Sequence, residues 1–421
     1  MPGSIATVQA SDPENQRDRK TERKPIHSTP TSTSHVERNI VSFRRSRLVA
    51  FLATGVAGAL MAGTLGWVVA ATSAPPASGL WVQLNEAPID PRFDAAAFPT
   101  SDGFVVWGGY EVGTDGATFP LTDGALLSLD EGAWTQLPEA PLSEAFGRTT
   151  ISTGDSLFVW GGEFGNGEKG RPDDGAAFSF RQGRWSPLPP SPRWSLAGHS
   201  MIWSGRQMLI WGGIGLSKGL RFSPSETTWT RLPDAPIPWR TSHGATWTEG
   251  EMFVWGGQDA EGEFLDDGAA FNPRTNRWRL LPRSPLGPRN EPTLTPIKNG
   301  IAIWGGWDKW GPRNDGAILN LRTGRWHYLG LAPIDNDTRG ARVLPVGGSF
   351  VVLSGKAMAR WDRTTSSWRT IERPPDGFPI GPAAAVSESF VFLWSGLTEV
   401  PDHLTGQGIV LPTSFLRSPV D

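Results

Sequence analysis

Six arginines recur about every 50 residues along most of the chain, each shortly before a β-rich run: Arg92, Arg148, Arg193, Arg240, Arg289 and Arg339. A guanidinium is always charged and presents a planar fork of donors that matches carboxylates. Brought together by the fold, the six predict a positive funnel for an anionic ligand, such as a carboxylate-bearing sugar, a polyanionic glycan or an acidic peptide loop. The alternative is that each arginine pairs with the aspartate of a recurring Asp-Gly-Ala motif and stiffens the fold, the aspartates being Asp123, Asp174, Asp267 and Asp315.

Four tryptophans lie beside these arginines or in a charged loop: Trp194, Trp239, Trp307 and Trp310. Trp194 follows Arg193 and Trp239 precedes Arg240, whereas Trp307 and Trp310 stand in the sequence WDKW. An exposed indole beside a guanidinium suits stacking on a sugar ring or a protein interface. The alternative is that these rings cap gaps in the core.

The residue types give little support for metal or catalytic chemistry. His199 and His243 open two successive predicted strands, but no third ligand of suitable spacing accompanies them. The absence of cysteine excludes disulfides, thiol nucleophiles and thiolate metal sites. No nucleophile-elbow, zinc-protease or phosphate-loop motif is present. Asp94 and Glu291 each follow an arginine by two positions, so either one suits general acid/base chemistry beside an arginine. We expect no metal and no cofactor.

The charge balance argues against a nucleic-acid partner. The chain has 421 residues with 39 Lys+Arg against 42 Asp+Glu, a net charge of −3, whereas nucleic-acid binding needs a clustered basic face. The counts of 21 Trp, 51 Gly and 37 Pro are unusual for a globular chain. Such an excess indicates that a motif is repeated.

Residues 1–47 and 48–71 differ sharply from the rest. Residues 1–47 are polar, rich in Ser, Thr and Pro, and contain nine basic against five acidic residues, so we predict a disordered basic tail. Residues 48–71 carry no charge and are long enough to span a bilayer as a helix. Arginines at 44, 45 and 47 precede this run, which predicts a cytoplasmic N-terminus.

A retained signal anchor and a cleaved signal peptide both fit this run. Residues 72–79 are predicted to be a Pro/Ala/Ser linker. In either case we expect the remainder of the chain to lie outside the cytoplasm, at the membrane or secreted.

Two motifs alternate beyond the linker, and each occurs seven times. The first is an apolar run that ends in glycine, at Phe104–Gly109, Phe158–Gly162, Leu209–Gly213, Phe253–Gly257, Ala302–Gly306, Phe350–Gly355 and Phe390–Gly396. The second is W-x-x-[LI] followed by proline, at Trp81, Trp134, Trp185, Trp229, Trp278, Trp326 and Trp368. Each repeat contains one copy of each motif, and its sequence predicts four short strands separated by turn residues.

A period near 50 with a Gly-Gly strand end and a downstream tryptophan resembles the kelch repeat, and the resemblance covers residues 80–415. It implies an all-β fold of the galactose oxidase central domain-like type, a β-propeller of four-stranded blades. The first tryptophan motif precedes the first Gly-Gly strand, and none follows the last. We therefore predict seven blades over residues 80–416, closed by an N-terminal strand at Trp81–Leu84 in blade 7. Residues 417–421 are left as a C-terminal tail.

The connectivity of a propeller determines on which face the candidate binding residues lie. With strands A to D running outward, the D–A and B–C connections share one face, and the A–B and C–D turns share the other. The A–B and C–D turns are tight, whereas five B–C loops are long: Tyr110–Thr122, Glu163–Asp173, Gln258–Asp266, Trp307–Asn314 and Leu397–Gln407. Because the arginines lie in the D–A connections, we expect the binding site on the face with the long loops.

Two functional hypotheses follow. The first is a non-enzymatic propeller, monomeric and membrane-tethered or secreted, that binds a protein or anionic glycan through this face. The second draws on a resemblance to the periplasmic sialic-acid mutarotases, which implies isomerisation of a carboxylated sugar. Galactose oxidase activity is excluded, because that relative needs a cysteine crosslinked to a tyrosine and this chain has no cysteine.

Overall fold

The computed structural model describes residues 81–113, 116–163, 175–192, 198–214, 219–334, 341–354, 357–371, 379–397 and 404–417. The predictions for residues 1–47, 48–71 and 72–79 lie outside the described residues, as do those for 418–421. No helix among the described residues is long and apolar enough to cross a membrane.

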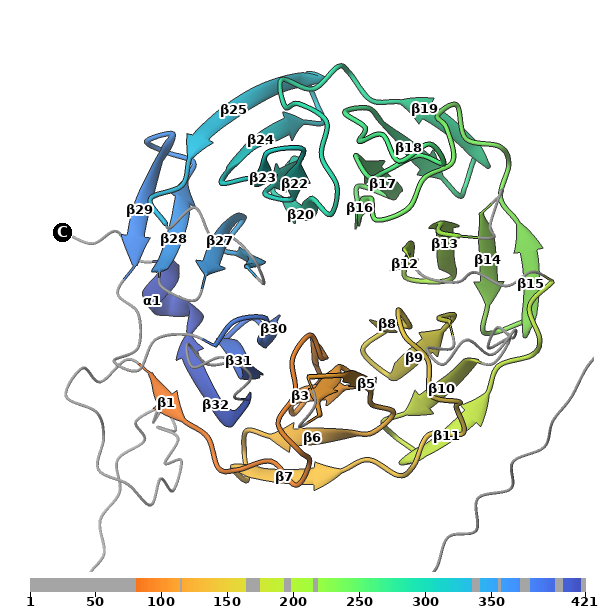
Figure 1. The fold of residues 1–421 in the computed structure, drawn as a ribbon, viewed down its shortest axis with the longest axis vertical. Coiled ribbons are helices and arrows are strands. Elements are labelled where there is room, and N and C mark those ends of the chain that lie inside the picture. The colour runs from red at the N-terminus through yellow and green to blue at the C-terminus, as the bar shows by residue number, and fades with distance from the viewer. Residues whose placement is uncertain are drawn as a thin grey trace, which may run out of the picture. The chain divides into compact units, whose positions relative to one another are not determined.

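Seven antiparallel four-stranded sheets are arranged in a circle around a central axis (Figure 1), which confirms the predicted seven-bladed β-propeller. Strand A of each blade lies nearest this axis, along which the channel of a propeller runs, and strand D lies on the outside. The strands are short because each pleated segment runs only from one tight turn or loop to the next.

The strands of the first four blades follow the chain from A to D. Blade 1 is β2 (Ala96–Pro99), β3 (Gly103–Trp107), β6 (Gly124–Ser128) and β7 (Ala133–Gln136). Blade 2 is β8 (Thr149–Ser152), β9 (Ser156–Trp160), β10 (Gly175–Ser179) and β11 (Arg184–Pro187). Blade 3 is β12 (His199–Trp203), β13 (Met208–Gly212), β14 (Leu220–Ser223) and β15 (Thr228–Arg231). Blade 4 is β16 (Gly244–Thr248), β17 (Glu251–Trp255), β18 (Gly268–Asn272) and β19 (Arg277–Leu280).

The last three blades complete the circle. Blade 5 is β20 (Thr293–Ile297), β21 (Gly300–Trp304), β24 (Asp315–Asn320) and β25 (Arg325–Leu331). Blade 6 is β26 (Arg342–Val346), β27 (Ser349–Ser354), β28 (Ala357–Asp362) and β29 (Ser367–Ile371). Blade 7 is β30 (Ala383–Val386), β31 (Phe390–Leu397), β32 (Leu404–Pro412) and β1 (Val82–Gln83).

The N-terminal strand closes the circle as predicted. Strand β1 pairs antiparallel with β32, with Val82 opposite Val410 and Gln83 opposite Ile409. The blade-7 loop is shorter than predicted, because β32 begins at Leu404, inside the range expected for that loop. A short helix that the sequence analysis did not predict, α1 (Thr413–Arg417), follows β32.

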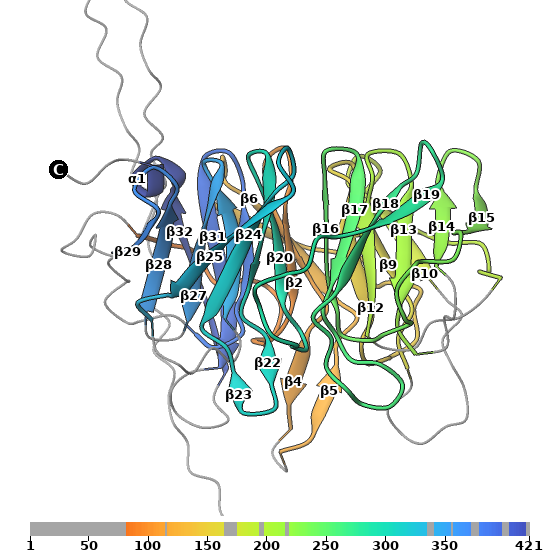
Figure 2. The same ribbon diagram turned by 90° about the horizontal axis from the view of Figure 1, so that it is seen from above.

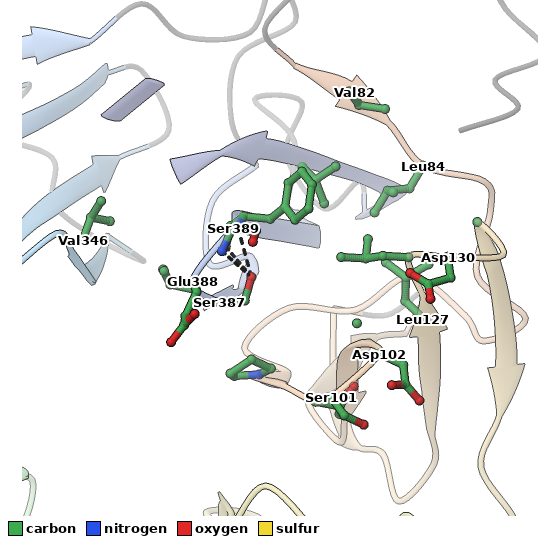
Figure 3. A pocket seen from close by; sticks show the side chains of 18 of the residues that line it. Val82, Leu84, Ser101, Asp102, Leu127, Asp130, Val346, Ser387, Glu388 and Ser389 are labelled. Carbon is green, nitrogen blue, oxygen red and sulfur yellow. Dashed lines mark hydrogen bonds between the residues drawn. The ribbon is translucent and has the colours of Figure 1, made fainter. Parts of the chain in front are cut away.

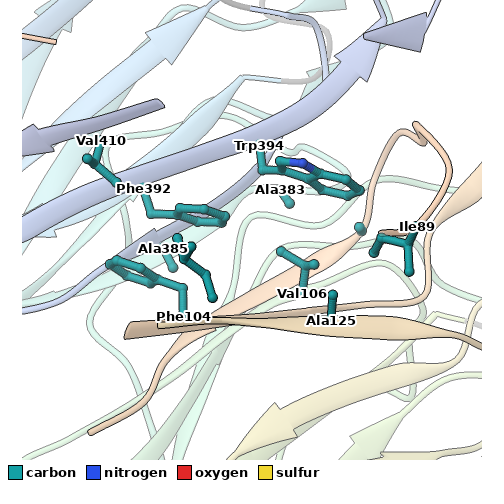
Figure 4. Packing of buried hydrophobic residues seen from close by; sticks show 11 residues of the cluster. Ile89, Phe104, Val106, Ala125, Ala383, Ala385, Phe392, Trp394 and Val410 are labelled. Carbon is teal, nitrogen blue, oxygen red and sulfur yellow. The ribbon is translucent and has the colours of Figure 1, made fainter. Parts of the chain in front are cut away.

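The apolar core lies between neighbouring blades. At the junction of blades 7 and 1 (Figure 4), the rings of Phe104 and Phe392 stack at 4.7 Å between centroids. Val106 and Trp394 belong to the same buried cluster. A single blade is too thin to bury its own faces, so each blade needs its neighbour, and closure removes the exposed sheet edges.

The tryptophan motif fastens each blade to the one before it. In blades 1 to 6 the indole Nε1 of strand D donates a hydrogen bond of 2.9–3.0 Å to a carbonyl of the preceding blade. The donor–acceptor pairs are Trp134–Asn85, Trp185–Pro138, Trp229–Pro189, Trp278–Pro233, Trp326–Pro282 and Trp368–Leu329. The same rings pack against the inter-blade core.

The two faces of the propeller differ as the connectivity requires. Figure 2 shows tight hairpins on one side and two projecting hairpins on the other. The projecting hairpins are β4 (Tyr110–Val112) with β5 (Thr118–Pro120) and β22 (Trp307–Asp308) with β23 (Gly311–Pro312), both built from predicted B–C loops. We call the side with the D–A and B–C connections the loop face, and the side with the A–B and C–D turns the turn face.

Candidate functional site

Three of the six arginines are buried and bonded in the same way. In Arg92, Arg240 and Arg289, Nε donates to the carbonyl two residues earlier and Nη1 donates to a carbonyl sixteen residues later. The later carbonyl belongs to the first glycine of the Gly-Gly pair, at 3.1–3.3 Å. Each arginine therefore ties its D–A connection to the end of strand B in the same blade.

The Gly-Gly pair makes this bond possible. The first glycine has a positive φ, +67° at Gly108, +69° at Gly256 and +70° at Gly305, a conformation that side chains disfavour. The second glycine touches backbone, since a Cβ at Gly257 would lie 2.5 Å from the Thr241 carbonyl oxygen. The repeated glycines are thus required by the close packing of strand B against the D–A connection.

The same arginines pair with the aspartates of the Asp-Gly-Ala motif. Ion pairs join Arg92 with Asp123, Arg240 with Asp267 at 2.7 Å, and Arg289 with Asp315 at 3.0 Å. For these three arginines the structure has the pairing with a local aspartate that was the alternative to an open funnel. Because the guanidinium groups are buried and bonded, they do not form an open positive funnel, and ligand binding by them stays a prediction.

The Arg289–Asp315 pair carries a wider polar network. Burial raises the pKa of Asp315, but the guanidinium groups of Arg289 and Arg313 outweigh it, so the pKa lies below its ordinary value. The Tyr328 hydroxyl donates to Asp315 at 3.2 Å. Burial and the Asp315 charge raise the pKa of Tyr328. Asp315 is therefore held as a carboxylate at neutral pH.

Arg148 serves blade 2 from a different position. The backbone bridge between Phe146 and Glu163 corresponds to the bridge between Phe93 and Tyr110 in blade 1. The counterpart of Arg92 is therefore Ala145, and Arg148 lies three residues later. Its Nη1 nevertheless reaches the first-glycine carbonyl of Gly161 at 3.1 Å, and its Nη2 reaches the Ser143 carbonyl at 2.8 Å. These two acceptors match those used by the other arginines. Arg193 and Arg339 lie outside the described residues, as does Trp194.

A set of residues with positive φ surrounds the channel at the loop face. Asp94, Ser242 and Glu291 have φ values of 51–53°. The corresponding residues of blades 2, 3 and 7 are glycines, Gly147, Gly198 and Gly381. Backbone bonds join neighbours in this set, from Ser242 N to Gly198 O and from Glu291 N to Ser242 O. Non-glycine residues in this conformation are strained and concentrate at functional sites.

A polar pocket lies between these residues at the mouth of the channel. Its volume is about 230 Å³, and its lining includes Asp94, Glu291, Trp307 and Arg342. Arg342 bonds the Asp94 carboxylate at 2.6 Å and the Pro382 carbonyl at 2.9 Å. The fold thus brings together the two carboxylates noted from the sequence. Arg342 was not predicted, although a second arginine three residues after Arg339 was a visible signal.

The tryptophans divide between structural and exposed roles. Trp239 is partly buried and donates to the Gly213 carbonyl at 2.8 Å, which fits the capping alternative. Trp307 pairs through its backbone with Asn290 and lines the central pocket. Trp310 is 79% exposed at the tip of the β22–β23 hairpin, with the Lys309 ammonium 4.4 Å from its ring. Of these three, only Trp310 presents its ring to solvent.

Two more exposed apolar side chains share the loop face with Trp310. Phe119, in the β4–β5 hairpin, is 45% exposed, and Ile214, at the B–C connection of blade 3, is 43% exposed. The β4–β5 hairpin is held at its base, because Tyr110 packs against Phe93 and Phe146 and its hydroxyl accepts a bond from Gly147 N. The hairpin that carries Phe119 is therefore fixed at its base.

His199 and His243 lie close enough to interact electrostatically. Burial, with the charges of Arg240 and His199, lowers the pKa of His243 to about 3. The Ser200 hydroxyl lies 2.9 Å from His243 Nε2. Within the described residues no group of three or more His, Asp or Glu side chains is placed to hold a metal ion. His243 is a neutral core residue between blades 3 and 4.

Comparison with known proteins supports the repeat assignment. Residues 198–380 match the family model described as the KLHDC2/KLHL20/DRC7 Kelch-repeats domain. This segment spans blades 3 to 6, so the kelch resemblance is confirmed there. A search of the curated proteins gives no match.

Proposed function

We propose that this propeller is a protein-binding module that engages its partner through the loop face. The observation that carries the proposal is the placement of Phe119, Ile214 and Trp310 on B–C loops of three different blades, all on one face. Protein-binding hot spots are enriched in tryptophan and other large side chains that are exposed in the free protein. Kelch propellers commonly bind proteins, which agrees with this use of the face.

Rigid support strengthens the proposal. Trp310 N donates to the Asp308 carboxylate at 2.9 Å, and Arg313 pairs with the same carboxylate at 3.3 Å. These bonds fix the hairpin before a partner arrives, which lowers the conformational entropy lost on binding. The buried and paired state of Arg92, Arg240 and Arg289 makes a polyanionic glycan a poorer fit than a protein.

Binding is also better supported than sugar isomerisation. A mutarotase of the kind considered from the sequence needs a carboxylate held near at least two arginines. The described lining of the central pocket offers Asp94 and Glu291 but a single arginine, Arg342, and that arginine is bonded to Asp94.

The test compares two sets of surface variants of the full chain. The first replaces Phe119, Ile214 and Trp310 with serine. The control replaces Leu280 and Leu331, exposed apolar residues on outer strands, with serine. Partners captured by the wild type should be retained by the control and lost by the loop-face variant. With a purified partner, Trp310→Ala should weaken binding by about 2 kcal/mol. Equal retention by both variants would contradict the proposal.

We also propose that the propeller is displayed outside the cytoplasm, tethered by residues 48–71 or released after their cleavage. The support is the uncharged run of 24 residues preceded by arginines at 44, 45 and 47. Protease added to intact cells should digest the propeller, whereas a cytoplasmic control protein should survive. If the propeller is protected in intact cells and digested only after lysis, the proposal that it lies outside the cytoplasm is wrong.

A further inference from the structure

The turn face carries a groove at the junction of blades 7 and 1 that the proposed function does not use. Its volume is about 810 Å³ (Figure 3), far larger than that of the central pocket on the opposite face. Val82 and Leu84 from the N-terminal strand form part of its wall, with Phe390 from blade 7. Leu127 and Leu129 line it from blade 1. The lining is therefore predominantly apolar.

The groove exists because blade 7 is assembled from both ends of the chain. The outer strand of each of the other blades follows a C–D turn, whereas β1 has two residues and β32 leads into α1. Leu416 of α1 packs with Trp81, Leu344 and Val346 and fills the junction of blades 6 and 7. The junction of blades 7 and 1 is left open at the turn face.

The rim of the groove is acidic. Asp102 lies in the A–B turn of blade 1, Asp130 in its C–D turn and Glu388 in the A–B turn of blade 7. Among the described residues that line the groove there is no lysine or arginine. Asp102 and Asp130 form no ion pair with any residue in the described part of the chain. Three carboxylates beside a low-dielectric wall create a local negative potential that attracts cations.

We propose that this groove binds an extended segment of a partner protein that combines aliphatic or aromatic side chains with an adjacent lysine or arginine. The volume is within the range of specific ligand sites and large enough for several side chains. An uncharged apolar segment would cover Asp102 and Asp130 without supplying an opposite charge, and an acidic segment would be repelled. Charge complementarity therefore selects a basic apolar segment.

The experiment uses the full chain and three pools of fluorescein-labelled nonapeptides. The first pool has Leu, Ile, Val or Phe in its centre and Lys or Arg at its flanks. The second keeps the centre and has Asp or Glu at its flanks, and the third keeps the basic flanks around a Ser/Gly centre. Fluorescence anisotropy should show saturable binding of the first pool at least tenfold tighter than either other pool, weakening as salt is raised.

Matched variants test the site itself. Asp102→Asn, Asp130→Asn and Glu388→Gln together should weaken binding of the first pool at least tenfold. Asp155→Asn is the control, because Asp155 occupies the same place in the blade-2 turn: the Asp155 carbonyl accepts from Phe180 N as the Asp102 carbonyl accepts from Leu129 N. Asp155 does not line the groove. The control and the loop-face variant should bind the peptides as the wild type does.

Several outcomes would overturn the proposal. These are the absence of binding by the first pool, equal binding of the acidic pool, and full binding by the triple variant. A photo-crosslinker at Ser101, on the groove wall, gives a further test with a bound peptide of the first pool. Cross-linking to the peptide supports the proposal, whereas cross-linking to a second copy of the chain or within the same chain contradicts it.

Discussion

The Ser395 hydroxyl accepts a hydrogen bond from Arg92 N at 2.7 Å and donates one to Arg92 O at 2.8 Å. The two residues are 303 positions apart, and both are buried. Ser395 stands where blades 1 to 5 have the first glycine of the Gly-Gly pair, and it keeps the positive φ of that position, at 58°. One side chain thus connects the last blade to the first arginine of the propeller.

Replacement of Ser395 by alanine should destabilise the propeller. The variant leaves the Arg92 amide and carbonyl buried without partners, at a cost of about 1–3 kcal/mol for each group left unsatisfied. Urea denaturation followed by tryptophan fluorescence measures the loss. Ser354→Ala is the control, because Ser354 holds the same motif position in blade 6 and its hydroxyl donates to the Ala357 carbonyl of its own blade. Equal losses for the two variants would show that the bond between blades is not the cause.

We expect the indole hydrogen bonds between blades to contribute to the free energy of unfolding by an amount that can be separated from the packing of the rings. Trp278→Phe keeps an aromatic ring in the core but removes the 3.0 Å bond to the Pro233 carbonyl. We expect a loss of about 0.5–1.5 kcal/mol in the free energy of unfolding, beyond the smaller effect of the reduced ring. Trp310→Phe, at an exposed position, should change stability by less than about 0.5 kcal/mol. A Trp278→Phe variant as stable as the wild type would contradict a stabilising role for the bond.

The buried His243 predicts a loss of stability in mild acid. Burial, with the charges of Arg240 and His199, lowers its pKa from 6.5 to about 3, so the folded state keeps it neutral while the unfolded state takes up a proton. The stability that the neutral form provides is complete above about pH 7 and is lost as the pH falls from 6.5 toward 3. The slope should approach about 1.4 kcal/mol per pH unit.

A variant isolates this contribution from that of the carboxylates. His243→Gln keeps a polar group near Ser200 but does not titrate. The difference in unfolding free energy between wild type and variant, measured by urea denaturation from pH 7.5 to 4.5, should shrink steadily below pH 6.5. A difference that stays constant with pH would show that the pKa of His243 is the same in the folded and the unfolded states.

The fold was largely predictable because its repeated signals are local and geometric. A Gly-Gly pair indicates a positive φ at the end of strand B, as at Gly108 and Gly256. A downstream tryptophan indicates the hydrogen bond to the preceding blade. The number of these motifs therefore predicts seven blades. The site was less predictable. Arg148 reaches the same acceptors from three residues away, because a long side chain allows more than one backbone position. The groove of the turn face lies where blade 7 lacks a C–D turn; the order of the motifs predicts that closure, but no motif marks a groove beside it.

The positive φ of Asp94 and Glu291 was also not predictable from the sequence. Glycine at the corresponding positions of three other blades would signal a positive φ, but an acidic residue gives no such signal. Asp94, Glu291 and Arg342 line one pocket because the fold places blades 1, 5 and 6 around the same end of the channel. Tertiary contacts of this kind are not encoded in local spacing.

Substitution of Arg240 distinguishes a structural role of the recurring arginines from a ligand-binding role. Its guanidinium is fully buried and donates to the carbonyls of Pro238 and Gly256 as well as to Asp267. Arg240→Met removes all of these bonds while filling a similar volume, so we expect a loss of roughly 3 kcal/mol in stability, since each of the two carbonyls left without its donor costs about 1–3 kcal/mol. Chemical denaturation measures the loss.

The control is Arg279→Met, because Arg279 forms an exposed ion pair with Glu251 at 2.5 Å and should contribute at most about 1 kcal/mol. A structural role also predicts that Arg240→Met, where still folded, binds the loop-face partner with the wild-type affinity. An unchanged stability combined with a loss of partner binding would reverse the assignment, since the guanidinium would then have to leave Asp267 and contact the ligand.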